Sequence, residues 1–134
     1  MSKLEKYKQY ESILKEVYYL SKKRKEMPRR NVFEQIEKKE LYSDLVYDFL
    51  MKQDMETVKV IQAIMYLGRE LESEFEEAKR KKEVNPDLLI DECLSKLTER
   101  KGWKTQSIEA HQISGKTSLD KYLSKAFEFF GMHV

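Results

Sequence analysis

The sequence predicts an all-α protein, a compact bundle of five or six helices around a central long helix at about residues 54–84. Two observations support this fold class. Apolar residues recur at three- and four-residue intervals, and residues that start or stop helices, such as Asn85, Pro86 and Gly131, delimit the segments. Such spacing is typical of helices that bury one side. Runs of alternating apolar and polar residues, which indicate β-strands, are hard to find.

The composition limits the class of protein. A length of 134 residues favours a single helical domain over residues 1–134. The single Cys argues against a disulfide-stapled secreted module. No apolar run approaches the roughly 20 residues of a membrane-spanning helix, and the first residues show no signal pattern. We therefore expect a soluble, cytoplasmic protein without a membrane partner.

Residues 1–30 predict a basic N-terminal helix, which runs from about Lys3 to Glu26 and ends before Pro28. Its apolar stripe consists of Tyr7, Tyr10, Leu14, Val17, Tyr18 and Leu20. Asn31 is expected to cap a short second helix, and a third helix from about Lys39 to Met51 repeats the apolar pattern.

The longest predicted helix covers about residues 55–83, with Asp54 as its N-cap. Its first half is apolar on nearly every side, so we expect it to be central in the core. In its second half acidic residues precede basic ones by three or four positions, which favours an exposed helix.

Asn85, Pro86 and Asp87 indicate the start of another helix, which should end at Gly102. Its expected inward residues are Leu88, Leu89, Cys93, Leu94 and Leu97. Residues 103–117 have no clean period and are interpreted as an irregular loop, in which a helical turn around 107–111 is left open. Thr117 or Ser118 then caps a last helix that Gly131 terminates.

The charge is distributed unevenly along the chain, although the formal net charge is only +2. Residues 1–30 carry ten bases and four acids, residues 31–85 carry nine and thirteen, and the remainder carries seven of each. The bases at the end of the first helix are Lys22, Lys23, Arg24, Lys25, Arg29 and Arg30. They can complement the dipole of their own helix, pair with the acidic middle of the chain, or contact an acidic partner or nucleic acid.

The patterns that would indicate catalysis, a cofactor or a metal each lack a residue or a structural context that the chemistry requires. The run from Ala110 to Thr117 has a loose nucleotide-loop spacing, but no apolar strand precedes it. His111 and His133 have no partner at ligand spacing, and Cys93 lies on an apolar helix side. We therefore expect no enzyme activity, no cofactor and no metal.

Gly68 lies in the middle of the strongest helix, where glycine costs about 1 kcal/mol relative to alanine. Such a glycine often permits the close approach of a helix or a ligand. Arg69 follows it and could bind a carboxylate or phosphate with two hydrogen bonds. Gly68 and Arg69 are therefore a possible interaction or anion site, and the alternative is a tight helix crossing with Arg69 paired to an acid such as Glu72 or Asp48.

Several segments together resemble a family of small bacterial proteins that share a domain of unknown function. They are Asp54-Met55-Glu56, Ile64-Met65-Tyr66-Leu67-Gly68-Arg69, Glu76-Glu77-Ala78-Lys79-Arg80, the stretch from Gly115 to Leu123 with its Gly-x-x-x-Leu-x-x-Tyr-Leu pattern, and Gly131. The match spans about residues 37–131. The resemblance implies an all-helical fold and no known activity.

The first hypothesis is a non-catalytic helical module for protein–protein interaction or regulation, which acts on an unknown protein partner or as a homodimer. The second is a nucleic-acid-associated protein that uses the basic N-terminal helix. The third is an inhibitor of a host protein encoded by a phage or mobile element, which fits the size and the Lys-rich composition.

Overall fold

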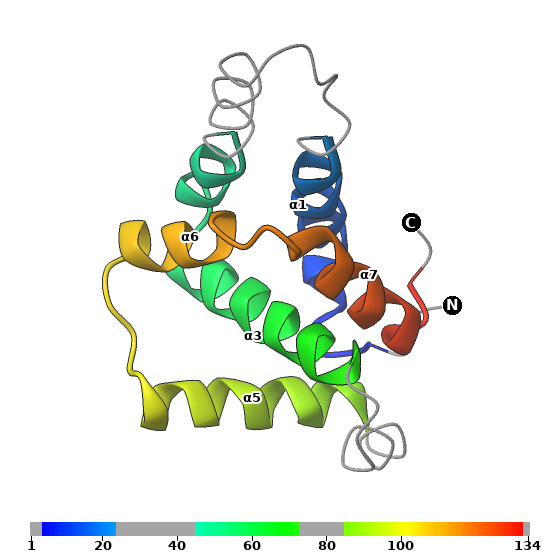
Figure 1. Ribbon diagram of the computed structural model, residues 1–134. Coiled ribbons are helices and arrows are strands. Elements are labelled where there is room, and N and C mark those ends of the chain that lie inside the picture. The colour runs from blue at the N-terminus through cyan, green and yellow to red at the C-terminus, as the bar shows by residue number, and fades with distance from the viewer. Residues whose placement is uncertain (1–3, 24–44, 73–84, 133–134) are drawn as a thin grey trace.

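The protein is all-α over residues 4–23, 45–72 and 85–132, which are the residues that the computed structural model describes (Figure 1). The helices are the single 3-10 turn η1 (Lys8–Tyr10), α1 (Glu11–Lys23), α3 (Met55–Glu72), α5 (Pro86–Arg100), α6 (Gln106–Ser114) and α7 (Leu119–Phe130). Residues 45–51 are also helical. These ranges contain no strand, so the predicted fold class is confirmed.

The centre of the fold is α3, as the sequence predicts. This helix packs against α5, α6 and α7, and α7 in turn packs against α1 (Figure 1). The apolar residues of α3 that are at most 3% exposed are Val58, Val60, Ile61, Ala63, Ile64, Met65 and Leu67. Burial in several directions is typical of a helix that neighbours cover on more than one side.

Three predicted helix ends are confirmed by their backbone chemistry. Asp54 Oδ1 accepts a hydrogen bond of 2.7 Å from the Thr57 N–H, which caps α3. Asn85 Oδ1 accepts one of 2.9 Å from the Asp87 N–H, with Pro86 at the first position of α5. Gly131 ends α7 with a φ of 72°, the left-handed conformation that glycine adopts without steric cost.

The first helix begins later than the sequence predicts. Residues 4–7 are not helical, and regular α-helix starts only at Glu11 after the 3-10 turn. The reason is a tertiary contact, because Leu4 is buried and the N–H groups of Glu5 and Tyr7 donate to the Asp87 carboxylate. A helix from residue 3 would turn these groups away from α5.

The interpretation of residues 103–117 as an irregular loop is wrong. Residues 106–114 form α6, which Thr105 caps by accepting a hydrogen bond from the Ile108 N–H. The helix buries Ala110 and Ile113, but it also buries Glu109. A charged residue on the inward side interrupts the helical spacing of apolar residues, which is the signal that predicts a helix.

One predicted inward residue of α5 is also wrong, because Leu88 is 59% exposed. The buried side of this helix carries Leu89 and Ile90, with Cys93, Leu94 and Leu97 packed partly against the core. Leu88, which comes directly after the buried Asp87, thus lies on the outer side of the first turn.

The side chain of Gln106, a residue of α6, caps the C-terminal end of the helical residues 45–51. Its Nε2 group donates to the backbone oxygens of Leu50 at 3.1 Å and of Gln53 at 2.6 Å. Gln106 thus binds the last carbonyl groups of this segment, where the Leu50 oxygen also accepts the Gln53 N–H at 3.1 Å. The predicted helix after Asn31 and the predicted helical residues 39–44 and 73–83 lie outside the described ranges.

Candidate functional site

One side of α1 is buried against α7. Leu14 and Val17 are fully buried, and the Tyr18 ring meets the Phe127 ring of α7 edge to face with centroids 5.5 Å apart. Aromatic pairs of this geometry add stability beyond the area that they bury. The helix is therefore fixed on the body of the protein, and its other side presents a rigid surface.

The other side of α1, together with the preceding turn η1, carries lysines and one exposed aromatic ring. Tyr19 is 53% exposed, Lys8 and Lys22 are exposed, and Lys15 is half-buried. The Lys22 ammonium lies 5.9 Å from the centroid of the Tyr18 ring, and that of Lys23 lies 5.3 Å from the Tyr19 centroid. We call Lys8, Lys15, Tyr19 and Lys22 the α1 stripe.

The lysines of the α1 stripe differ from many other lysines of the protein in how their charge is balanced. Elsewhere in the described ranges, lysines pair with a carboxylate, as Lys6 does with Asp91, Lys59 with Glu56, Lys96 with Glu92, Lys101 with Glu109 and Lys125 with Glu128. Across the described ranges Lys8, Lys15 and Lys22 form no ion pair. Within these ranges no carboxylate therefore balances their charge.

The basic end of α1 also lies far from the acidic end of α3. In Figure 1 α1 rises to one end of the molecule, whereas α3 ends beside α5 at the other. Lys22, in the last turn of α1, thus complements the dipole of its own helix, and it forms no ion pair with Glu70 of α3. The other predicted contact residues Arg24, Lys25, Arg29 and Arg30 lie outside the described residues.

Gly68 has a packing role at the crossing of α3 and α7. It is buried, and a Cβ placed on it would stand 1.8 Å from the backbone oxygen of Tyr122. This close approach is one of the two reasons that the sequence offers for a glycine here. Arg69 is exposed beside it, and an anion site at this arginine stays a prediction.

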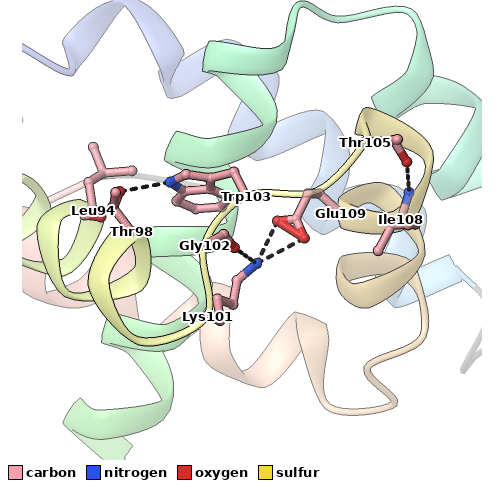
Figure 2. A network of polar contacts seen from close by, with 8 residues as sticks. All are labelled: Leu94, Thr98, Lys101, Gly102, Trp103, Thr105, Ile108 and Glu109. Atoms are coloured by element: carbon pink, nitrogen blue, oxygen red, sulfur yellow. Dashed lines mark hydrogen bonds and ion pairs between the residues drawn. The ribbon is translucent and has the colours of Figure 1, made fainter.

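A polar network joins α5 to α6 (Figure 2). The Lys101 ammonium donates to both carboxylate oxygens of the fully buried Glu109, at 2.8 and 2.6 Å, and to the Gly102 oxygen. The Trp103 ring lies 4.5 Å from the same ammonium, and its Nε1 donates to Thr98 Oγ1 at 2.8 Å. Because the Glu109 side chain is fully buried and both of its oxygens accept from Lys101, the network fixes the connection between the helices.

A second polar cluster holds the N-terminal residues on the start of α5. The Asp87 carboxylate accepts the backbone N–H groups of Glu5 at 2.9 Å and Tyr7 at 3.2 Å. The Asp91 carboxylate accepts a hydrogen bond of 2.8 Å from the Lys6 ammonium and another from the Tyr7 hydroxyl. Sequence reasoning missed both clusters, since their partners are charged residues without a short-range pattern.

No three His, Cys, Asp or Glu side chains in the described part of the chain lie close enough to hold a metal ion. Cys93 packs against the core, and its Sγ donates to the Ala63 oxygen at 3.5 Å. No helix within the described residues is both long and apolar enough to cross a membrane.

Comparison with known proteins yields no relative: no protein-family model, no curated protein and no solved structure matches the chain. The resemblance carried by Leu67-Gly68-Arg69 and by residues 115–123 therefore stays a prediction.

Proposed function

We propose that the protein is a non-catalytic interaction module that binds an acidic surface of a partner protein through the α1 stripe. The observation that carries this proposal is the absence of any ion pair on Lys8, Lys15 and Lys22 within the described residues, beside the exposed ring of Tyr19. Cations that are not neutralised internally attract an acidic partner and orient its approach.

The arrangement of the α1 stripe suits recognition. Tyrosine is enriched among the residues that dominate binding energy at protein interfaces, because it buries a large ring at low entropic cost. Since α1 is packed on α7 through Leu14, Val17 and Tyr18, little of the backbone must be ordered when the partner binds.

A nucleic acid is the second candidate partner, because the Lys22–Tyr18 and Lys23–Tyr19 contacts combine cations with aromatic rings. The overall charge favours a protein. Nucleic-acid-binding domains commonly have a pI above about 9, whereas the chain has a net charge of +2 and a pI of about 8.5.

The test is capture of proteins from a cell lysate on three immobilised forms of the protein. The forms are the natural sequence, K15E/K22E in the α1 stripe, and K52E/K121E, which makes the same charge change at exposed lysines elsewhere. We expect acidic proteins to be retained by the first and third forms and lost by the second. Equal retention by all three forms, or none by any, contradicts the proposal.

Titration with duplex and single-stranded oligonucleotides at two salt concentrations separates the second candidate. Binding that weakens steeply with salt and is lost in K15E/K22E would replace the protein partner by a nucleic acid.

A further inference from the structure

The lysines of the α1 stripe are spaced by seven residues. Lys15 and Lys22 lie on the same flank of α1, because seven residues of an α-helix fall only about 20° short of two turns. At 1.5 Å per residue their Cα atoms are about 10 Å apart along the axis. Lys8, in η1, precedes Lys15 by another seven residues, and Tyr19 lies between Lys15 and Lys22.

From this spacing we infer that the binding element of the partner is an acidic α-helix that lies along α1. Its carboxylates recur every seven residues and face Lys15 and Lys22, and a small or apolar side chain between them contacts the Tyr19 ring. This inference rests on the proposed function, and it adds the secondary structure and the charge pattern of the partner.

The repeat distance favours a helix over an extended segment. In a helix, side chains seven residues apart share one side and repeat at about 10 Å. In an extended chain, side chains on one side recur every second residue, at about 6.6 Å and then at about 13 Å. Neither distance matches the separation of Lys15 and Lys22, so an extended acidic segment can pair with one of them and then falls out of register.

The exposed Glu16 adds a constraint on the partner. It lies one turn before Tyr19, on the side of the ring away from Lys15 and Lys22. A carboxylate placed opposite Glu16 would be repelled, whereas a basic residue there would pair with it. The charge pattern of α1 therefore selects one register of an acidic helix and disfavours a uniformly acidic one.

The test uses two synthetic Ala-based helical peptides of identical composition, with circular dichroism to verify that both are helical. In the first the glutamates recur every seven residues, and in the second they recur every five and so spread around the helix. NMR titration of the whole protein measures the affinity of each. We expect the first peptide to bind about tenfold more tightly, which is the scale of a few added exposed ion pairs, and to shift amide signals of residues 15–22.

Substitutions in the protein give the matching controls. K15E/K22E should lose the first peptide and bind a version with lysine in place of each glutamate, whereas K52E/K121E should bind as the natural sequence does. Because Lys15 is half-buried, K22E alone, at an exposed position, is a second variant, and circular dichroism verifies that it is folded.

The outcomes separate this inference from the proposed function. Equal affinity for the two helical peptides, or equal affinity for a Gly/Ser-based peptide with the same glutamates, overturns the acidic helix while α1-dependent capture of acidic proteins still stands. Failure to bind any peptide while that capture persists overturns it as well. Loss of the dependence on Lys15 and Lys22 in both experiments overturns the proposed function itself.

Discussion

The backbone of Gly68 in α3 lies directly against the backbone carbonyl of Tyr122 in α7. A Cβ at residue 68 would be 1.8 Å from the Tyr122 oxygen and 2.6 Å from its carbonyl carbon. Both are main-chain atoms, so no side-chain rotation can relieve the contact. The most extensive helix–helix contact of the described structure is that of α3 with α7, and it therefore requires the absence of a side chain at this residue.

The substitution Gly68→Ala should destabilise the protein by about 2–4 kcal/mol, although alanine is favoured in an isolated helix by about 1 kcal/mol. Urea denaturation followed by circular dichroism measures the change. Gly102→Ala is the control, because Gly102 has a φ of +68° with no atom near its Cβ position. It should cost only about 1–2 kcal/mol, from backbone strain. A G68A variant as stable as the natural protein would show that α3 and α7 do not cross as described.

Loss of the Lys101 ammonium should strongly destabilise the fold, because it leaves the fully buried Glu109 carboxylate without its partner. We expect Lys101→Met to cost about 3 kcal/mol. The single tryptophan, Trp103, reports unfolding by fluorescence at the same place. The double variant K101M/E109L should regain much of the loss, since it removes both charges. A double variant that is less stable than K101M alone would contradict this account.

The Asp87→Ala substitution should free the N-terminal residues from α5. Both backbone hydrogen bonds that Asp87 accepts would be lost, so the amides of Glu5 and Tyr7 should exchange with deuterium at least about tenfold faster. Asp91→Asn is the matched control, because it leaves those two bonds intact. Unchanged exchange at Glu5 and Tyr7 in D87A would mean that the burial of Leu4 and the contacts with Asp91 are sufficient to hold this segment.

Acid should weaken the contact between Lys6 and Asp91. The hydrogen bond from Lys6, followed by that from Tyr7, holds the pKa of the Asp91 carboxyl below its usual range. A group whose pKa is lower in the folded state stabilises it above the unfolded pKa of about 3.9, and this contribution is lost as the pH falls through the folded pKa. Denaturation between neutral and acidic pH should therefore show a smaller loss of stability at low pH for D91N. An identical pH profile would contradict the contact.

Tyr7 should stabilise the fold up to alkaline pH and lose this contribution as the pH rises further. Burial, followed by the hydrogen bond to Asp91, raises the pKa of Tyr7 to about 12. A raised pKa stabilises the folded state fully below the unfolded value of about 10, and this contribution is lost as the pH rises through about 12. The variant Tyr7→Phe should lack this alkaline loss, which denaturation at pH values above about 10 would measure. If Y7F loses stability there as the natural protein does, other tyrosines are responsible.

Local signals in the sequence are sufficient for much of the fold. Helix caps and terminators bind groups only a few residues away, so they can be predicted without knowledge of the tertiary structure. The examples are Asp54, Asn85 and Gly131. The central position of α3 follows from its apolar residues on nearly every side.

The features that sequence reasoning missed depend on distant partners. The Glu109 carboxylate of α6 is buried, and the ion pair with Lys101 is what stabilises it there. The late start of α1 depends on Asp87, about 80 residues away along the chain. Net charge per segment likewise does not show which lysines are paired, and only the fold separates Lys22 from Lys6.

The position of α7 affects how the chain can acquire its structure during synthesis. α1 and α3 are both made before α7, yet both pack against it. While the ribosome is still adding α7, the apolar side of α1 and a large part of α3 have no surface to cover them. The nascent chain is therefore expected to remain a chaperone substrate until α7 has left the exit tunnel, and to fold in one late step.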